Sequence, residues 1–309
     1  MRNDERHSAA YLRAESRDFW WNEDFLQLIA RRWKLDEVTS ALDVGAGLGH
    51  WSTTLLPHLS AAATITGIER DATWVREATD RARRRRLEAR LEFRHGLAEQ
   101  LPFDAGSFDL VTCQTLLLHT PDPAAVVREM ARVTKPGGRV LLVEPVNMAA
   151  SLLLGSTRFR EDVDDTLRLL RFELVCYRGK ERVGEGNNSI GALLPELLAG
   201  AELDAIDAYQ SDKATLLVPP YDSPEARAVT HDHFQWTDDA FWIWSKPDTH
   251  RYYLAGGGEP TTFETEWAFA LASARRVAEA ITRGTEHSIG AGVTFLASGV
   301  KPRGDPFAP

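Results

Sequence analysis

The sequence has few cysteines and no excess of basic residues. Only two cysteines occur among 309 residues, Cys113 and Cys176, which excludes a disulfide framework and a four-cysteine zinc site. The formal net charge is −9, and an acidic chain repels the phosphates of nucleic acid. Four arginines at residues 83–86 are expected at the C-terminal end of a helix, where the dipole favours cations. We therefore expect no nucleic-acid partner and no metal.

The sequence also lacks a long apolar run. The most apolar stretch, residues 140–154, is interrupted by Glu144 and Pro145 and is too short and polar to span a bilayer. Residues 1–7 are charged, and no apolar segment of a secretory signal follows them. The composition is that of an ordinary globular protein, with 43% hydrophobic and 26% charged residues. We expect a cytoplasmic protein without a membrane partner.

Short apolar strands alternate with amphipathic helices over the first half of the chain. Apolar spacings of three and four residues predict a helix within residues 18–33, and Asp71 and Asp122 are typical helix caps. Such alternation specifies a parallel sheet that is covered on both faces. The strands are expected at residues 40–45, 64–69, 91–94, 108–112 and 139–143.

A glycine loop follows the first of these strands and opens a helix, at residues 41–51. Glu69 closes the second strand, about 20 residues later. A glycine loop followed by an acid at this distance seats an adenosine-containing ligand at the edge of the sheet. The glycines follow Gly-x-Gly-x-Gly and not Gly-x-Gly-x-x-Gly, which argues against a nicotinamide dinucleotide and an oxidoreductase.

Five motifs in order make the chain similar to the class I S-adenosylmethionine-dependent methyltransferases, close to the small-molecule branch of the ubiquinone/menaquinone-biosynthesis type. The motifs are LDVGAGLG at 42–49, GIERD at 67–71, GLAEQLPF at 96–103, SFDLV at 107–111 and RVTKPGGRV at 132–140. The resemblance implies an α/β fold with a Rossmann-like seven-stranded sheet. Its last strand is antiparallel and inserted beside the strand before it, and residues 291–300 are the candidate.

The resemblance implies S-adenosylmethionine as cofactor and S-adenosylhomocysteine as product. Glycines without a β-carbon let the loop backbone approach the ligand, and the helix N-terminus offers free amides. Asp43 either orients the loop and the ligand's amino group or only braces the loop. The cofactor-binding candidates in this loop are Asp43, Gly45, Ala46, Gly47 and Gly49.

Further cofactor candidates follow later strands. Glu69 is expected to accept hydrogen bonds from both ribose hydroxyls, the alternative being a helix-capping acid. The stem of Arg70 is expected to cover one face of the adenine. Leu97 and Ala98 are expected along the adenine edge, although many relatives carry an acid where Leu97 stands. Gln114 begins the loop beside the expected sulfonium, or it merely ends a strand.

Tyr11, Trp20 and Trp21 precede the core. In similar proteins an N-terminal segment folds over the cofactor, often with a tyrosine near the methionine carboxylate, so Tyr11 is a cofactor-binding candidate. Trp20 and Trp21 are expected in the core or in this lid.

The catalytic candidates are His119, Glu144 and His233. Methyl transfer requires a general base only if the acceptor must lose a proton, because positioning and water exclusion supply much of the acceleration. His119 stands where relatives often carry a histidine without a catalytic role. Glu144 is alternatively a structural acid at a strand end. His231 and His233 are two residues apart, which is weak evidence for a metal.

The expected domain organisation has five parts. They are an N-terminal helical lid at 1–37, the cofactor-binding core at 38–149, a helical insertion at 150–200, the remaining core strands at 201–221 and 288–302, and an aromatic-rich helical cap at 222–287. The strand at 203–209 is possibly extended by 214–218. Aromatics at the density of the cap either wall an apolar acceptor pocket or form a small core.

These observations predict a methyltransferase that moves a methyl group to oxygen, nitrogen or carbon of a small, partly apolar metabolite. A non-catalytic S-adenosylmethionine-binding protein with a sensing or scaffolding role is the alternative. The absence of an Asn/Asp-Pro-Pro-aromatic tetrapeptide disfavours a nucleic-acid methyltransferase. The sequence leaves the acceptor, the methylated atom and the oligomeric state open.

Overall fold

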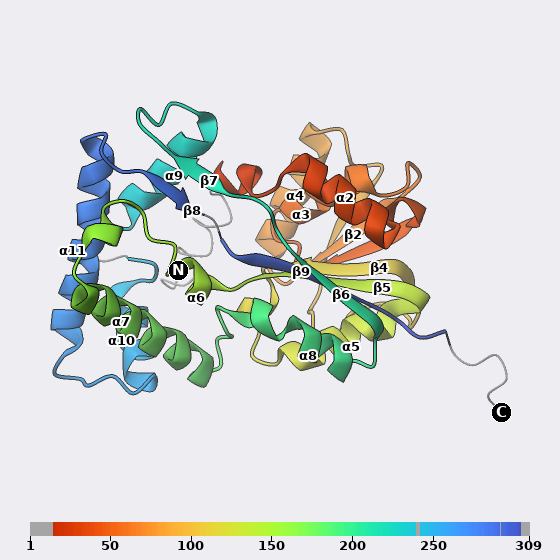
Figure 1. The fold of residues 1–309 in the computed structure, drawn as a ribbon. Coiled ribbons are helices and arrows are strands. Elements are labelled where there is room, and N and C mark those ends of the chain that lie inside the picture. Colours follow the sequence, from red (N-terminus) through yellow and green to blue (C-terminus); the bar gives the residue numbers. More distant parts are fainter. Residues whose placement is uncertain (1–14, 239–241, 291, 304–309) are drawn as a thin grey trace. The chain divides into compact units, whose positions relative to one another are not determined.

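A computed structural model describes residues 15–238, 242–290 and 292–303. The chain divides into two compact units, each of which is described by itself. The first, here called the sheet unit, contains residues 21–146, 189–212 and 294 onward. The second, here called the helical unit, contains the residues up to 20, 147–188 and 213–293. Figure 1 shows the elements of both units.

The sheet unit holds a seven-stranded sheet with the order β3-β2-β1-β4-β5-β9-β6. The first five strands are parallel, and β9 runs antiparallel between β5 and β6 (Figure 1). The expected inserted, antiparallel last strand is therefore confirmed, at Thr294–Val300. The other strands are β1 (Ser40–Val44), β2 (Thr64–Glu69), β3 (Leu91–His95), β4 (Phe108–Gln114), β5 (Thr134–Pro145) and β6 (Asp204–Gln210).

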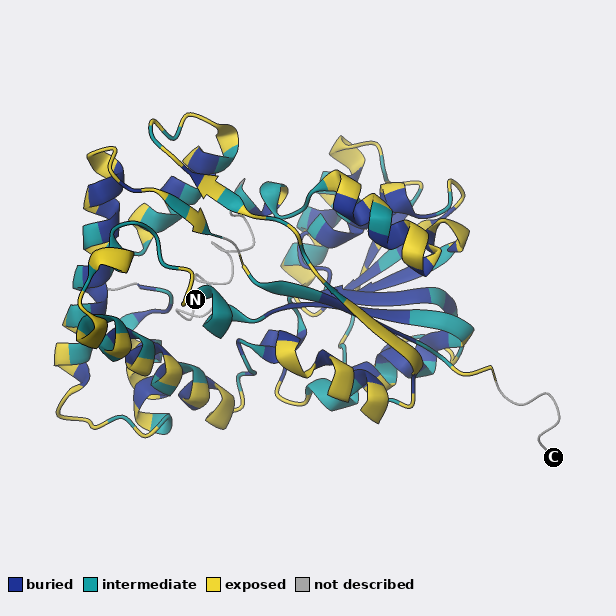
Figure 2. Cartoon of the chain, viewed as in Figure 1, coloured by how far each residue is buried: buried dark blue, intermediate teal, exposed yellow. Residues whose placement is uncertain are grey.

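Helices cover both faces of this sheet, because successive strand residues point to opposite sides. Ala41 packs into one apolar cluster with α2 (Glu23–Trp33), α3 (His50–Leu55) and α4 (Ala72–Arg84). Its neighbour Leu42 packs into a second cluster with α5 (Pro123–Val133) and α8 (Leu194–Gly200). The central strands are buried on both faces (Figure 2), as parallel strands require.

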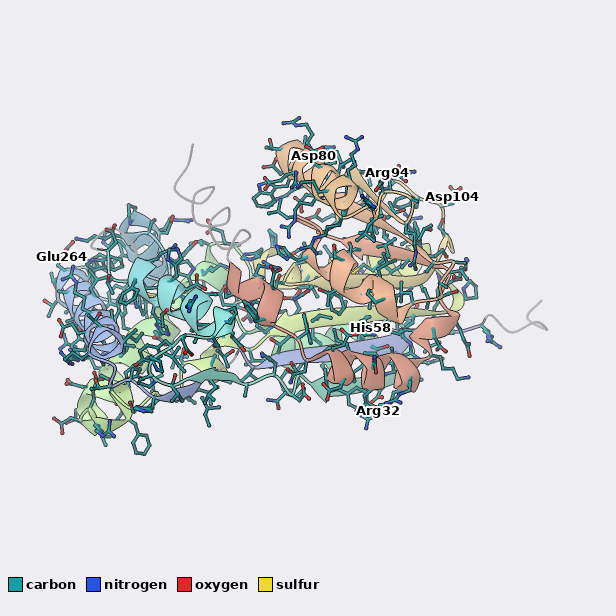
Figure 3. The ribbon with its side chains drawn as sticks, turned by 90° about the horizontal axis from the view of Figure 1, so that it is seen from above. Arg32, His58, Asp80, Arg94, Asp104 and Glu264 are labelled. Carbon is teal, nitrogen blue, oxygen red and sulfur yellow. The ribbon has the colours of Figure 1, made fainter. Side chains whose placement is uncertain are left out.

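The outer surface of the sheet unit is charged. Arg32 on α2, Asp80 on α4 and Arg94 on β3 are exposed and labelled in Figure 3. The helix caps predicted from the sequence are present. The Asp71 carboxylate accepts the Thr73 amide at 2.7 Å, and Asp122 accepts the Ala125 amide at 2.9 Å. These two bonds set the first residues of α4 and α5.

Asp109 joins three strands of the sheet at the ends away from the glycine loop. Its Oδ2 accepts the backbone amides of Thr39 and Ser40, at 3.0 and 2.9 Å, and both hydroxyls. Its Oδ1 accepts Lys135 Nζ at 2.7 Å. Burial raises the pKa of the Asp109 carboxyl, but these hydrogen bonds outweigh burial and hold the pKa well below its ordinary value. The pairing of β1, β4 and β5 is stabilised at this end.

The helical unit contains two small apolar clusters. One lies among α7, α10 and the first half of α11, and is rich in aromatics such as Phe172, Trp244 and Tyr253. The other lies among α9, β7 and the second half of α11. The elements are α6 (Asn147–Ala150), α7 (Val163–Arg182), β7 (Thr215–Leu217), α9 (Pro224–Gln235), α10 (Lys246–Ala255), α11 (Phe263–Thr282) and β8 (Ser288–Gly290).

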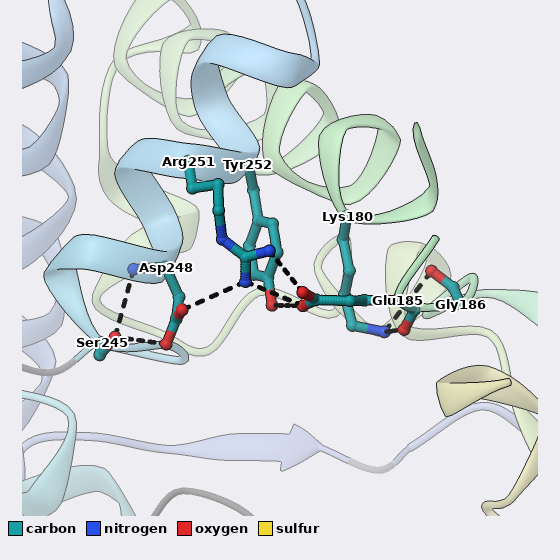
Figure 4. Close-up of polar contacts among 7 residues, drawn as sticks. All are labelled: Lys180, Glu185, Gly186, Ser245, Asp248, Arg251 and Tyr252. Atoms are coloured by element: carbon teal, nitrogen blue, oxygen red, sulfur yellow. Dashed lines mark hydrogen bonds and ion pairs between the residues drawn. The ribbon is translucent and has the colours of Figure 1, made fainter. Parts of the chain in front are cut away.

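A polar network joins α10 to the segment after α7 (Figure 4). The Glu185 carboxylate accepts hydrogen bonds from the Arg251 guanidinium, one of them at 3.0 Å, and from the Tyr252 hydroxyl. Lys180 donates to the Glu185 carbonyl at 2.5 Å, and its burial lowers the pKa of its ammonium group to about 8. Ser245 caps α10 by accepting the Asp248 amide at 3.2 Å. The C-terminal end of α7 is thereby held against α10.

The units divide the chain differently from the expected boundaries in several places, one of which is the split of the expected lid at 1–37 between Trp20 and Trp21. Residues 189–200 group with the sheet unit, because Ile190, Leu194 and Leu198 are buried in the second apolar cluster of the sheet. Residues 215–217 do not extend β6. They pair with β8 in a separate two-stranded sheet of the helical unit. Among the described residues, none of the helices has the length and apolarity needed to cross a membrane.

Candidate functional site

The loop from β1 to α3 is folded back onto β2. The amides of Gly45 and Ala46 both donate to the Ile68 carbonyl, at 2.8 and 3.0 Å. Gly45 and Gly49 have φ angles of 71° and 75°, and Gly47 has 53°, in the left-handed region that side chains disfavour. The Gly-x-Gly-x-Gly spacing is therefore a backbone requirement of this turn.

Glu69 meets this loop from the end of β2. Its Oε2 accepts the Gly47 amide at 3.0 Å, and its Oε1 accepts the Asp71 amide at 3.0 Å. The residue is buried. The structure thus brings together the glycine loop and the acid that lies 22 residues after Gly47, at the carboxyl ends of adjacent parallel strands. Both groups face the edge where sheets of this type bind ligands.

The space that three glycines leave is filled by two side chains from distant segments. A β-carbon on Gly45 would lie 2.6 Å from Cδ1 of Leu116, and one on Gly49 would lie 2.6 Å from Cζ of Phe93. One on Gly67 would lie 2.5 Å from Cδ1 of Phe93. The sequence predicts that the loop glycines let a ligand approach, but it does not predict this packing role. No local signal identifies Leu116 or Phe93, because the contacts are made across strands.

Asp43 is buried directly behind the loop. Its Oδ2 accepts the Ser52 hydroxyl at 2.6 Å, which ties the end of β1 to the first turn of α3. One residue earlier in α3, the Trp51 indole donates to the Thr112 hydroxyl at 3.0 Å. These contacts have the geometry of a loop-bracing acid, one of the two roles considered for Asp43.

The loop after β4 is held by Glu144 at the end of β5. Its Oε1 accepts the amides of Leu116 and Leu117, at 2.8 and 2.7 Å. The carboxyl is fully buried, and burial raises its pKa to about 8, although the amide hydrogen bonds oppose this. Thr115 has a φ of 53° at the turn, and Gln114 is buried at the last position of β4. This geometry favours loop bracing by Glu144 over contact with a reacting group.

The other catalytic candidates lie in different surroundings. His119 is exposed at the end of a short 3-10 helix, Leu117–His119, in the sheet unit. His233 belongs to α9 of the helical unit, where it packs edge-on against Trp236. Desolvation lowers the pKa of His233, while Glu286 and Asp232 oppose the shift. Only His119 and Glu144 are brought into one unit.

The remaining cofactor candidates lie along the ends of β2 and β3. Arg70 and Leu97 are exposed, and Ala98 packs against the second apolar cluster of the sheet. The Gly96 amide donates to the Glu69 carbonyl at 3.1 Å, which places the segment with Leu97 beside Glu69 at the edge of the sheet. Tyr11 lies outside the described residues.

The two tryptophans before the core belong to different units. Trp20 lies in the helical unit, under the guanidinium of Arg17 at 4.4 Å. Trp21 lies in the sheet unit, where its ring centroid is 5.5 Å from that of Trp51. Trp21 therefore supports the helix that follows the glycine loop.

The donor and acceptor groups at this edge fit an adenosine-containing ligand. A buried carboxylate at the end of β2 is suited to accept hydrogen bonds from vicinal hydroxyls. Among the described residues, no side chain caps the first turn of α3. The site therefore offers the buried Glu69 carboxylate as an acceptor beside the glycine loop, whose Gly45, Ala46, Gly47 and Gly49 amides donate within the protein.

Comparison with known proteins agrees with this geometry. Residues 42–142 match the family described as a methyltransferase domain. A demethylmenaquinone methyltransferase of Geobacillus kaustophilus is 33% identical over 145 residues, which cover 45% of this chain and 60% of that protein. YcgJ of Bacillus subtilis, an uncharacterised methyltransferase, is 38% identical over 103 residues, covering 33% of this chain and 39% of that one.

The similarity in sequence is confined to part of each protein. The chain spans about half the length of two further demethylmenaquinone methyltransferases that it matches. The crystal structure of Bacillus subtilis YcgJ aligns over 92% of this chain and 100% of its own, with 21% identity and a TM-score of 0.52. That likeness shows the fold.

Proposed function

We propose that this chain transfers a methyl group from S-adenosylmethionine to a small, partly apolar metabolite. The proposal is supported by the match of residues 42–142 to a methyltransferase domain and by the similarity to a demethylmenaquinone methyltransferase. The observation that carries the proposal is the hydrogen bond from the Gly47 amide to Glu69 Oε2, at 3.0 Å. It places an acceptor for ribose hydroxyls directly beside the glycine loop.

In this proposal the chain's own residues bind and orient. Glu69 accepts hydrogen bonds from the ribose, and the loop backbone around Gly47 and Gly49 lies against the methionine part. Gln114 and the loop braced by Glu144 shape the space near the sulfonium. The bound cofactor supplies a methyl group activated by a positive sulfur, and S-adenosylhomocysteine is the product. Positioning of the acceptor and exclusion of water account for much of the acceleration.

The proposed acceptor is small and partly apolar, with oxygen, nitrogen or carbon as the receiving atom. Two features support it: the similarity to demethylmenaquinone methyltransferases and the net charge of −9, which disfavours polyanionic acceptors. If the acceptor must lose a proton, His119 and His233 are the candidates for the base. The pH dependence of turnover in their alanine variants separates the two.

Isothermal titration of S-adenosylmethionine and S-adenosylhomocysteine tests the cofactor assignment. We expect micromolar or tighter binding, and a loss of about 10- to 100-fold in Glu69→Ala, because a charged acceptor contributes about 1.5–3 kcal/mol. Glu92→Ala is the matched control, since Glu92 is an exposed acid on β3 whose carboxylate accepts hydrogen bonds from Arg94 at 2.9 Å. Absence of binding by both ligands to the unmodified protein would contradict the proposal.

Turnover separates the enzyme from a non-catalytic binding protein. Release of S-adenosylhomocysteine is measured with a panel of phenols, quinols and amines. Release of S-adenosylhomocysteine with any acceptor supports the proposed methyltransferase activity. Tight cofactor binding without production on the whole panel favours the sensing or scaffolding alternative.

A further inference from the structure

Helix α7 exposes an apolar stripe on the side opposite its core contacts. Its buried side chains, such as Leu169, Phe172 and Cys176, pack into the aromatic cluster of the helical unit. On the opposite side, Val163 is 73% exposed, Leu167 is 57% exposed, and Leu174 is also exposed. These residues are four and seven positions apart and therefore lie along one line of the helix.

The stripe is longer than these three residues. Leu170, half-buried, completes the alternating spacing of four and three that is typical of a seam between two helices. Phe159, just before α7, is 77% exposed. Scattered apolar residues on a surface need no explanation, but a continuous line of them along a 20-residue helix marks an interaction surface.

The charges beside the stripe change sign along the helix. Asp164 is exposed next to it in the first turn, and Arg171 and Arg178 are exposed on the same edge further along. Arg178 also contacts Glu181 at 3.3 Å, whereas Asp164 and Arg171 have no partner among the described residues. The edge is therefore acidic at its N-terminal end and basic toward its C-terminal end.

We propose that α7 packs against α7 of a second copy of this chain, antiparallel, to form a two-fold symmetric dimer. A two-fold axis near the middle of the stripe places Val163 of each copy opposite Leu174 of the other. The same operation sets Asp164 between Arg171 and Arg178 of the partner copy, so the interface is complementary to itself. A parallel two-fold pair would place the two charged edges on opposite sides of the seam, so that Asp164 would face neither arginine of the partner's edge, and it would bring the like ends of the two helix dipoles together.

The surface is preformed, because α7 is held from its other side. Arg168 contacts Glu266 of α11 at 3.0 Å, and the network of Glu185 with Arg251 holds the C-terminal end. A helix of 20 residues is about 30 Å long, enough for two copies to interact over several turns. The proposal does not depend on the methyltransferase activity, since the stripe contains none of the proposed cofactor or catalytic residues.

Sedimentation velocity of the full chain, over about a hundredfold range of concentration, tests the dimer. We expect a monomer–dimer equilibrium, and Leu167→Glu raises the dissociation constant at least about 100-fold, because two charges would be buried at the centre of the seam. Ile289→Glu is the matched control. Ile289 is 69% exposed on β8 of the same unit, so this variant keeps the dimer.

Two results would overturn the proposal. One is a protein that stays monomeric at every concentration, whether or not it binds phospholipid vesicles through the stripe. The other is equal weakening by Leu167→Glu and Ile289→Glu, which would indicate nonspecific association. Circular dichroism establishes that both variants are folded, as expected for substitutions outside the buried clusters.

A charge-swap cycle tests the pairing across the seam. Asp164→Arg places like charges together and weakens the dimer about 3- to 10-fold, whereas Asp164→Arg combined with Arg171→Asp recovers most of this loss. If the helices contact one another without the proposed register, the double variant does not recover the affinity of the dimer. That result contradicts the antiparallel arrangement.

Cysteine cross-linking determines the orientation. Val163→Cys and Leu174→Cys are prepared separately, and a disulfide between copies is expected only when the two variants are mixed. In the antiparallel register two copies of residue 163 are about 16 Å apart, too far for a disulfide. Both native cysteines are buried, so the background is low. Cross-linking of either variant alone but not of the mixture overturns the orientation.

Discussion

Replacing Glu144 with glutamine is expected to stabilise the protein at neutral and alkaline pH and to change little in acid. The carboxyl is fully buried, and its Oε1 accepts two backbone amides at 2.8 and 2.7 Å. Its Oε2 has no hydrogen-bond partner in the described part of the chain. A glutamine at this position keeps an oxygen for the two amides and has no charge to bury.

The magnitude follows from the pKa of the carboxyl. Burial raises the pKa of Glu144 from 4.5 to about 8. The folded state therefore holds the proton more tightly than the unfolded state. The resulting contribution to the free energy of unfolding is fully present below pH 4.5, and it is lost as the pH rises through 8. At about 1.4 kcal/mol per pKa unit, the loss amounts to about 5 kcal/mol.

Glutamine has no proton to lose, so the variant escapes this loss. The difference in unfolding free energy between Glu144→Gln and the unmodified protein is expected to be small below pH 4.5, about 3 kcal/mol at pH 7 and about 5 kcal/mol above pH 8. Glu144→Ala is the contrasting variant. It leaves the Leu116 and Leu117 amides without an acceptor, which costs about 1–3 kcal/mol for each at every pH.

Urea unfolding followed by circular dichroism at several pH values measures both differences. A constant difference between Glu144→Gln and the unmodified protein from pH 5 to pH 9 would refute the reasoning. It would mean that the amides keep the carboxylate ionised despite its burial. The same variants assayed for cofactor binding report whether the loop after β4 is displaced.

Three further changes test other contacts of the sheet unit. Gly67→Ala places a β-carbon 2.5 Å from the Phe93 ring, so we expect a loss of about 1–3 kcal/mol that Phe93→Leu partly restores in thermal unfolding. Asp109→Asn removes the 2.7 Å contact with Lys135 and is expected to cost about 1–3 kcal/mol at pH 7. Because the folded pKa of Asp109 is lowered, this stabilisation is present above pH 3.8 and fades as the pH falls further, so the two proteins converge in acid unfolding experiments. Asp71→Ala is expected to cost about 1 kcal/mol in the same thermal assay, and an unchanged melting temperature would show that the cap contributes nothing.

Local patterns predicted much of the sheet unit correctly. The alternation of Ala41 and Leu42 between two apolar clusters follows from the two-residue period of a strand. The caps Asp71 and Asp122 act on amides two and three residues away, so their role is contained in a short segment. The antiparallel last strand was predicted through the order of motifs in a family.

Strand partners and small packed segments could not be predicted in the same way. Residues 215–217 have the composition of a strand, but their partner β8 is about 70 residues further along the chain. Residues 190–200 are apolar on one face, and Ile190, Leu194 and Leu198 of this face pack into the second apolar cluster of the sheet unit. Which elements such a face packs against depends on contacts with distant segments of the chain.

The glycine loop illustrates the same division. The sequence alone determined that Gly45, Gly47 and Gly49 form a tight turn and that Glu69 follows at the distance of an adenosine site, because the turn is a local backbone requirement. Only the tertiary structure decided that Phe93 and Leu116 fill the space beside these glycines, and that Glu144 is a buried acid holding two amides. Packing and desolvation depend on neighbours from other strands, and no local pattern of residues specifies them.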